Sequence, residues 1–327
     1  MKNLSLSKLL AGSILAVGIS TAAQAQAGGA TVSIVVPQPA GNPTDGVARK
    51  LQPLLQKELG QTVIVENAPG AGGSIGVQKV LSDASRSTAL LIVSQTETIL
   101  TPLTIKNARY KPEDFQAVAV VARLPYILAA RPNLNANTPV QLAELAKKES
   151  AELSFGNIGP GSMIHLLGEQ WARKNGVKLN QISYKGVPPV TQDLMGSQID
   201  LTFLPLGGAT LSMIQSGKVK AIGTSGAASP GHLPQVQAIS KSDSKMADFV
   251  YGTWIAFLVP GKTPPAVVDR LNRALVAAMK DPDFQTYVTS SGMDVANANA
   301  LPEVERFYKA ETRLYQELAR KIGVTAE

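Results

Sequence analysis

The stretch 62-TVIVENAPGAGGSIGVQKVL-81 runs from a β-branched segment, through a glycine-rich turn, into an amphipathic segment. The same order stands upstream, where 32-VSIVV-36 leads through 37-PQPAGNPTDG-46 into apolar residues at helical spacing that end at Gly60. A third apolar segment follows at residues 89–93. Apolar strands that alternate with helices predict a parallel sheet covered by helices on both faces.

A second unit of the same kind follows along the chain. The pattern predicts strands at residues 153–155, 181–184, 199–203 and 219–223, and helices at 141–148, 163–174, 189–195 and 211–215. Extended segments at 124–130 and 253–260 link the two units, and helices at 264–279, 284–290 and 302–322 return to the first. We expect an α/β fold with two lobes and two crossing strands, in which residues 31–127 and 254–327 form lobe 1 and 128–253 form lobe 2. A ligand would lie between the lobes, at the carboxyl ends of the strands.

The N-terminal segment has the features of a secretory signal peptide. Lys2 and Lys8 precede or flank a short apolar run at residues 9–19, and Ala23-Gln24-Ala25 is a small-residue cleavage pattern. The run is too short to span a membrane. We therefore expect residues 1–25 to be a signal peptide and the mature protein to be periplasmic. The sequence has no Cys, which excludes disulfides, thiol nucleophiles and cysteine metal ligands.

The charge of the chain is moderately positive. The formal net charge is +7, and removal of Lys2 and Lys8 with the signal peptide leaves +5. Because the basic residues are spread out and do not alternate with aromatic residues, we expect no nucleic-acid partner. A weak long-range attraction for anionic ligands is the functional consequence of this charge.

Three glycine-rich loops lead from a strand end into a helix start, at residues 39–45, 71–76 and 156–162. Helix N-termini expose unpaired N–H groups with partial positive charge, and glycine lets a ligand approach the backbone closely. Thr44, Ser74 and Ser162 add hydroxyl groups to these loops. The loops predict a main-chain anion site, with a carboxylate as the expected anion. The alternative is that such turns serve only close packing. Residues 70–76 lack the lysine of a P-loop and a suitably placed acid for a dinucleotide fingerprint.

Five segments, in this order, resemble the Bug solute receptors, the extracytoplasmic binding proteins of tripartite tricarboxylate transporters: residues 34–76, 154–169, 183–203, 217–226 and 257–275. The resemblance covers nearly the whole mature chain. It implies a periplasmic-binding-protein (venus-flytrap) fold with two crossing strands and a carboxylate held between the lobes. It also implies a permease of the tripartite tricarboxylate transporter type as the partner of the receptor.

The resemblance also implies which residues bind the ligand. The backbone and ordered waters of the first two loops would bind one carboxylate, and the turn after the third strand would add polar contacts. The second lobe would contact the far end of the ligand. The predicted ligand-binding residues are Ala40, Gly41, Thr44, Gly73, Ser74, Ser94, Gln95, Thr96, Asn157, Gly161, Ser162 and Gly207.

The chain departs from the usual pattern of the family that it resembles at two places. Many relatives carry an acid after residues 199–203, where this chain has Leu204 and then 205-PLGG-208. An acid there would suit a ligand amino group, so its absence favours a di- or aromatic carboxylate over an amino acid. The segment 82-SDASRSTALL-91 also lacks the acid-Gly-Tyr pattern that usually precedes the third strand.

The residues give little support for catalysis. His165 and His232 are the only histidines, and neither a G-x-S-x-G elbow nor an H-E-x-x-H motif is present. We interpret His165 as a residue that packs or caps at a helix start, and Asp193 and Asp200 as supports of the second lobe. We expect a monomeric receptor without cofactor, metal or catalytic residues, which delivers a carboxylate to a permease. Two alternatives remain: a receptor that signals to a two-component sensor kinase, and an exported hydrolase that uses Ser162 and His165.

Overall fold

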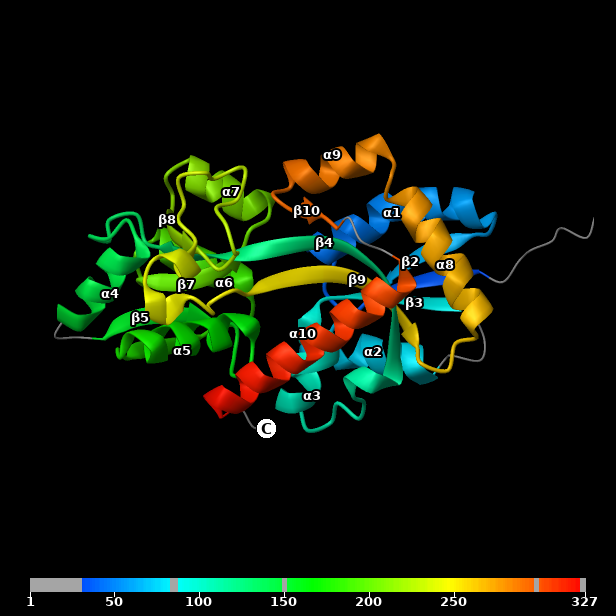
Figure 1. The fold of residues 1–327 in the computed structure, drawn as a ribbon, viewed down its shortest axis with the longest axis horizontal. Helices are drawn as coiled ribbons and strands as arrows, with labels where there is room; N and C mark the ends of the chain where they lie inside the picture. Colours follow the sequence, from blue (N-terminus) through cyan, green and yellow to red (C-terminus); the bar gives the residue numbers. More distant parts are fainter. Residues whose placement is uncertain (1–30, 83–87, 149–151, 297–299, 324–327) are drawn as a thin grey trace, which may run out of the picture.

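The computed structural model describes residues 31–82, 88–148, 152–296 and 300–323, so the predicted signal peptide lies outside the described residues. Two α/β lobes lie side by side, and the long strands β4 (Phe115–Ala130) and β9 (Gly252–Pro260) run between them (Figure 1). The strand order is β2-β1-β3-β9-β4-β7-β5-β6, with β10 and β8 paired to β4. The two crossing strands therefore join both lobes into one continuous sheet, in agreement with the predicted architecture.

The first lobe is built on the parallel strands β1 (Val32–Val36), β2 (Val63–Asn67) and β3 (Thr88–Val93). Strand β9 pairs antiparallel with β3 and with the first part of β4, and the short β10 (Asp294–Val295) closes the edge. One face packs against α1 (Pro43–Leu59), α8 (Pro265–Ala278) and α9 (Pro282–Ser290). The other face packs against α2 (Ser74–Ser82), the short α3 (Thr101–Thr104) and α10 (Leu301–Ile322).

The second lobe repeats this plan. Strand β5 (Leu153–Asn157) pairs in parallel with β6 (Leu179–Ser183) and β7 (Leu201–Pro205), while β7 and β8 (Lys220–Thr224) flank β4 in antiparallel pairs. Helices α4 (Pro139–Lys148) and α5 (Met163–Asn175) cover one face, and α6 (Val187–Met195) and α7 (Gly208–Gln215) cover the other. Short helical turns complete the described chain: η1 (Ala71–Gly73), η2 (Thr96–Leu100), η3 (Pro112–Asp114), η4 (Ile239–Lys241) and η5 (Ser244–Met246).

Several elements have bounds that differ from the sequence-based expectation, and β4 differs most. Strand β4 begins at Phe115, nine residues before the predicted start at 124, because both of its faces are buried and small alanines replace an alternating pattern. Helix α1 begins at Pro43 because the Asn42 side chain accepts the N–H of Asp45 and caps the helix there. It ends as predicted at Gly60, which adopts φ 62°.

Helix α10 packs on β4 of the first lobe, as predicted, but it also contacts α5 of the second lobe. Arg173 Nη1 donates to Lys321 O at 2.7 Å at this second contact. The helical spacing of Phe307, Leu314, Leu318 and Ile322 predicts that these residues form the contact face, but Leu314 is 37% exposed. The buried stripe instead contains Tyr308 and Tyr315, whose hydroxyls donate to backbone carbonyls at Pro112 and Gly252. Because a tyrosine has an apolar ring and a hydroxyl that can form a hydrogen bond, tyrosines can lie on the packed face of α10.

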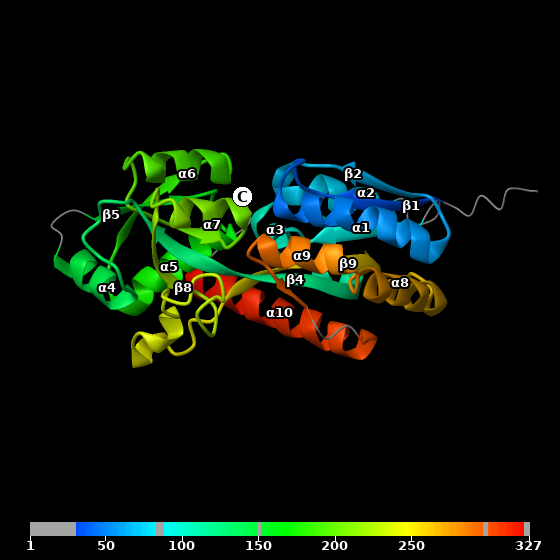
Figure 2. The same ribbon diagram turned by 90° about the horizontal axis from the view of Figure 1, so that it is seen from above.

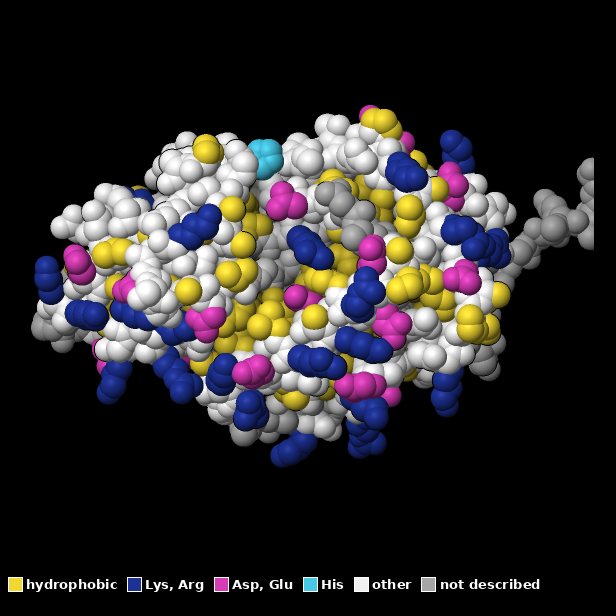
Figure 3. All heavy atoms as spheres, in the orientation of Figure 1, with side chains coloured by type: hydrophobic (Ala, Val, Ile, Leu, Met, Phe, Trp, Pro, Cys, Tyr) yellow, Lys and Arg dark blue, Asp and Glu magenta, His cyan; other side chains and the backbone are white. Residues whose placement is uncertain are grey.

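Both tryptophans are buried in the core: Trp171 is 1% exposed and Trp254 is 2% exposed. Across the described ranges, every helix is too short or too polar to span a membrane. On the face of the molecule that carries α10, lysine and arginine side chains are scattered over both lobes (Figure 3). This distribution agrees with the spread of charge along the sequence.

Candidate functional site

The loops singled out by the sequence lie where the lobes face each other. The chain enters β1 and β5 at opposite outer ends of the molecule, and both strands run toward its middle (Figures 1 and 2). The loops after β1 (residues 37–42), β2 (68–73) and β5 (158–162) therefore lie at the inner ends of the lobes. Together with the turns after β3 (94–97) and β7 (206–208), we call them the interlobe site.

The first loop is held by Asp45, which is only 3% exposed. Its Oδ2 accepts from Gly41 N at 2.9 Å and from Arg49 Nε at 3.1 Å, and its Oδ1 accepts from Asn67 Nδ2 at 3.0 Å. Burial by itself would raise the pKa of Asp45, but the bonds from Arg49, Gly41 and Asn67 hold this pKa below its usual value. Through these bonds Asp45 fixes the left-handed turn at Gly41 (φ 88°).

The bond to Asp45 uses the N–H of Gly41, but two neighbouring N–H groups are left over. Within the described residues, the amides of Ala40 and Thr44 make no hydrogen bond. Thr44 lies in the first turn of α1, where unpaired N–H groups carry partial positive charge. These two predicted residues are therefore placed as main-chain donors for an anion.

Close packing explains part of the glycine content of the second loop. A Cβ on Gly76 would lie 2.8 Å from Pro37 Cβ and 2.8 Å from Ala68 O, so any side chain there would push the first two loops apart. Gly73 adopts φ 89°, and its N–H donates to Gly70 O at 2.9 Å. Ser74, 3% exposed, begins α2 next to it. The packing alternative therefore holds for Gly76, and it also holds for Gly73, whose Cβ would lie 2.6 Å from a side-chain carbon of Glu97.

Glu97 was not singled out by the sequence analysis, yet it connects the loops of the first lobe. Its Oε1 accepts from Gln38 Nε2, and its Oε2 accepts from Ser94 N at 2.9 Å and Ser94 Oγ at 2.8 Å. A Cβ on Gly73 would lie 2.6 Å from Glu97 Cγ. Burial raises the pKa of Glu97, against the effect of the bonds from Gln38 and Ser94. The only sequence signal was an acid directly after a strand and its turn, next to apolar residues.

The turn after β3 directs two of its three predicted side chains into the protein. Ser94 gives both of its donors to Glu97. Gln95 is fully buried, donates to Gly252 O at 3.2 Å and accepts from Thr253 Oγ1 at 3.0 Å. Among the described residues, only Thr96 of the three has a side chain without a hydrogen bond. Its half-buried hydroxyl is the one of this turn that remains available to a ligand.

The loop of the second lobe satisfies several of its own polar groups. Asn157 Oδ1 accepts from Gly159 N at 2.8 Å and from Ser183 Oγ at 3.1 Å, and Asn157 Nδ2 donates to Gln181. Ser162 Oγ donates to Gly159 O at 2.7 Å and accepts from His165 N at 3.3 Å, which caps α5. Asn157 and Ser162 therefore shape this loop through internal bonds.

The start of α5 supplies donors that the sequence analysis missed. Gly161 N donates to His165 Nδ1 at 3.2 Å, so this predicted donor is already paired. In the described part of the chain, the N–H groups of Met163 and Ile164 have no hydrogen-bond partner. They lie in the first turn of a 13-residue helix, at its positive end. The signal for them was the Ser162 cap itself, which marks the helix start.

His165 behaves as a helix-start residue. Its ring accepts from Gly161, whereas its backbone N–H contacts the Ser162 hydroxyl. Burial lowers the pKa of His165, although nearby Glu169 acts in the opposite direction. A serine nucleophile requires the imidazole to accept its hydroxyl proton. The Ser162 hydroxyl instead donates to Gly159 O, so the geometry is that of a cap.

Gly207 lies at the place where the lobes touch. A Cβ at this position would be 3.9 Å from Ser291 O and 4.0 Å from Pro43 Cγ, and both of those residues belong to the first lobe. Its φ of −130° is accessible to any residue. Gly207 therefore marks one edge of the interlobe site.

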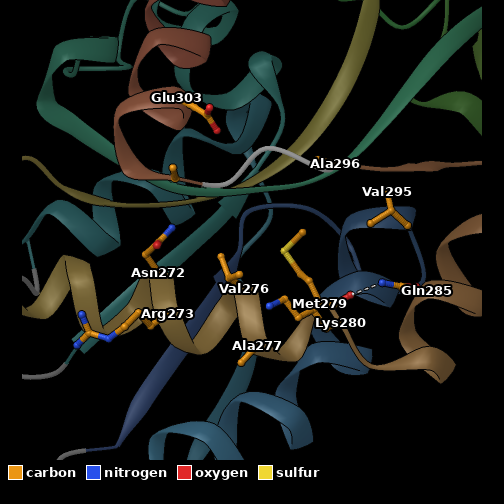
Figure 4. Close-up of a pocket in the computed structure, with 11 residues that line it drawn as sticks. Asn272, Arg273, Val276, Ala277, Met279, Lys280, Gln285, Val295, Ala296 and Glu303 are labelled. Atoms are coloured by element: carbon orange, nitrogen blue, oxygen red, sulfur yellow. Dashed lines mark hydrogen bonds between the residues drawn. The ribbon is translucent and has the colours of Figure 1, made fainter.

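A cavity of about 560 Å³ lies elsewhere, between α8, the start of α10 and the segment around β10 (Figure 4). Arg273, Lys280 and Glu303 line it, but none of the twelve predicted ligand-binding residues does. It is thus separate from the interlobe site. Over the described ranges, no group of three or more His, Asp or Glu side chains could hold a metal ion.

Comparisons with known proteins agree with this architecture. Residues 47–324 match the tripartite tricarboxylate transporter family receptor. A UPF0065 protein of Agrobacterium vitis is 33% identical over 298 residues, which cover 89% of this chain and 84% of the relative. The solved periplasmic binding protein BugD is 34% identical, with a TM-score of 0.76 over 91% of this chain and 99% of BugD. MatC from Rhodopseudomonas palustris, solved with bound malate, is 25% identical, with a TM-score of 0.76 over 88% and 98% of the two chains. The predicted resemblance and the two-lobed fold class are confirmed.

Proposed function

The chain belongs to the tripartite tricarboxylate transporter receptor family, and on this premise we propose that it captures a small organic carboxylate between its lobes and delivers it to a membrane permease of that transporter type. Its family and fold are those of periplasmic solute-binding receptors. The observation that carries the proposal is the pair of helix starts in opposite lobes. Thr44 at α1 and Met163 at α5 have amides without a partner among the described residues, at inner ends of the two lobes.

The proposed ligand site keeps the twelve predicted residues and divides their roles. Ala40, Thr44 and Thr96 would bind from the first lobe, and the amides of Met163 and Ile164 would bind from the second. The other predicted residues would shape the loops or the edge of the site: Gly41, Gly73, Ser74, Ser94, Gln95, Asn157, Gly161, Ser162 and Gly207. Dispersed main-chain donors suit a carboxylate, which accepts several hydrogen bonds at once.

The lobe boundaries remain part of the proposal: residues 31–127 with 254–327 in one lobe, and 128–253 in the other. Strand β4 changes its partner from β9 to β7 between Pro125 and Tyr126, and β9 begins at Gly252. These changes of pairing support a hinge at the two crossing strands. A ligand that contacts both lobes would favour the closed arrangement, because only differential contact shifts a conformational equilibrium.

The ligand class follows from the turn after β7. Leu204 is fully buried there and Gly207 has no side chain, so this turn offers no carboxylate to a ligand amino group. We propose a di- or aromatic carboxylate rather than an amino acid. MatC, a relative solved with malate, supports the dicarboxylate choice. The proposal includes a monomeric receptor in the periplasm after removal of the signal peptide.

The first test is a thermal-shift and calorimetric panel of malate, adipate, benzoate and glutamate on the mature protein. A ligand at a concentration of 100 times its Kd should stabilise the folded state by about 2.7 kcal/mol. We expect stabilisation by malate, adipate or benzoate, with the acid recovered unchanged. Binding of glutamate alone would contradict the ligand class, and binding of none of the four would contradict carboxylate capture.

A matched pair of variants tests the helix-start donors. Met163→Pro and Met163→Ala both remove the buried side chain, but only proline also removes the N–H. Proline is tolerated at the first helical position, and Ser162 before it is already extended (ψ 152°). We expect the proline variant to bind the acid at least tenfold more weakly than the alanine variant. Equal Kd values would show that this amide does not bind the ligand.

A further inference from the structure

The Glu97 side chain contacts all three loops of the first lobe in the interlobe site. Gln38 of the first loop donates to its Oε1, and Ser94 of the third donates twice to its Oε2. Gly73 of the second loop lies so close that even a methyl group would come within 2.6 Å of Glu97 Cγ. These contacts link loops that are separated by up to 59 residues along the chain.

The backbone of Glu97 is itself fixed from the opposite side. Tyr110 Oη donates to Glu97 O at 2.6 Å, and the neighbouring residues Thr98, Ile99 and Leu100 are buried. The carboxylate therefore projects from a rigid π-helical turn, η2, rather than from a mobile loop. A fixed acceptor that takes three donors sets the positions of the groups that donate to it.

We propose that Glu97 is the positioning residue of the carboxylate site. Glu97 does not contact the ligand. It holds the loops of Gln38, Gly73 and Ser94 in the arrangement that directs the Ala40 and Thr44 amides toward the ligand. The inference rests on the proposed carboxylate-binding function. It also explains why the two donors of Ser94 and the side-chain amide of Gln38 point toward Glu97, since their hydrogen bonds hold the loops in this arrangement.

Two substitutions of Glu97 separate geometry from charge. Glu97→Ala removes the three side-chain hydrogen bonds from Gln38 and Ser94. Glu97→Gln keeps an acceptor for Ser94 and supplies an NH₂ group that can donate to Gln38 once its amide turns over. With whichever of malate, adipate and benzoate binds the wild type most tightly, we expect at least a tenfold higher Kd for Glu97→Ala. We expect no more than a threefold higher Kd for Glu97→Gln.

Glu311→Gln is the matched control, because Glu311 is a half-buried carboxylate of the same lobe whose hydrogen bonds, among the described residues, run to Trp254 Nε1 at 3.0 Å and to Tyr315 and not to the loops of the interlobe site. It should leave the Kd within twofold of the wild type. If Glu97→Ala does not fold, Gln38→Ala replaces it in the test, since this substitution removes one hydrogen bond to Glu97 at a half-buried side chain. We expect at least a threefold higher Kd for it. A Kd of Glu97→Ala within twofold of the wild type would overturn the proposal, and so would a Glu97→Gln variant that binds as weakly as Glu97→Ala. Where Gln38→Ala is used, an unchanged Kd of that variant would also overturn it.

Amide hydrogen exchange provides a readout that does not depend on the ligand. In the unliganded protein, Glu97→Ala should accelerate exchange at residues 38–46 and 70–76, and Glu311→Gln should not. A variant that only loses overall stability would not single out these loops. If the wild type binds no acid, the proposed function fails and the exchange result alone decides the positioning role. Unchanged exchange in both loops would overturn it.

Discussion

Gln95 Oε1 accepts a hydrogen bond from the Thr253 hydroxyl at 3.0 Å, which joins the turn after β3 to the start of the return strand β9. The other end of the same amide donates to Gly252 O at 3.2 Å. Gln95 is fully buried, and the Gly252 carbonyl that it binds also accepts from the Tyr315 hydroxyl. The proposed hinge is thus bonded directly to the interlobe site of the first lobe.

Removal of this link should destabilise the protein. Gln95→Ala removes both hydrogen bonds, takes away the acceptor of the Thr253 hydroxyl and opens a cavity at a fully buried position, so we expect a loss of about 3 kcal/mol in the free energy of unfolding. Thr253→Val keeps the shape and removes only the hydroxyl, for an expected loss of about 1–2 kcal/mol. Urea unfolding of both variants measures these changes. A loss below about 0.5 kcal/mol for Gln95→Ala would show that the amide bonds add little to stability.

Gly73 is the glycine whose replacement should affect the site most directly. An alanine there would have φ 89° and a Cβ 2.6 Å from Glu97 Cγ and 3.3 Å from Pro37 O. We expect Gly73→Ala to lower the free energy of unfolding by about 2–4 kcal/mol through strain and steric overlap. It should also weaken carboxylate binding, because the second loop must move.

Gly60→Ala is the control for the backbone contribution alone. Gly60 also has a positive φ of 62°, but nothing lies within 4 Å of its Cβ position. This variant should lose only about 1 kcal/mol and bind normally. Thermal unfolding and calorimetry on both variants compare them. Equal losses would mean that the contact between Gly73 and Glu97 relaxes without cost.

The helices and parallel strands could be predicted because their signals are local. The apolar spacing after Val47, the stop at Gly60 and the cap at Ser162 each act within one or two turns of the chain. The loops at Gly41 and Gly73 were likewise visible as glycine between a strand and a helix. Local propensity and periodicity determine such features.

The connections inside the site could not be predicted in the same way. Glu97 meets Gln38 across 59 residues, and Gln95 meets Thr253 across 158 residues. Those pairings arise from the order of strands in the sheet and leave no periodic signal. The burial of Tyr315 on α10 has the same cause, because its hydroxyl finds Gly252 O only after the lobes are assembled.

Asp200 should give the second lobe a measurable acid sensitivity. Its Oδ1 accepts from Arg131 Nε at 2.7 Å, and its Oδ2 accepts from Ser154 N at 2.8 Å and Ser154 Oγ at 2.7 Å. Burial by itself would raise the pKa of Asp200, but the bonds from Arg131 and Ser154 hold it below its usual value. A carboxyl with a lowered folded-state pKa stabilises the fold above its unfolded pKa of about 3.9 and loses that effect as the pH falls through the folded value.

Asp200→Asn should therefore cost about 2 kcal/mol at pH 7, with a smaller difference from the wild type at pH 3. Urea unfolding at the two pH values measures this difference. Asp294→Asn, at an exposed carboxylate on β10, serves as the control and should change stability little at either pH. A cost for Asp200→Asn that is the same at both pH values would mean that the carboxyl acts by shape rather than by charge.

The contact at Gly207 predicts how side-chain size should control lobe closure. A Cβ there meets Ser291 O at 3.9 Å and Pro43 Cγ at 4.0 Å, which is ordinary van der Waals contact, and φ is −130°. Gly207→Ala should therefore close and bind within about twofold of the wild type. Gly207→Leu adds atoms beyond the space between the lobes and should hold this edge apart. We expect at least a tenfold higher Kd for the leucine variant, about 1.4 kcal/mol. Small-angle X-ray scattering with saturating acid should show compaction for the wild type and the alanine variant but not for the leucine variant. If the leucine variant compacts and binds normally, the lobes do not close against this edge.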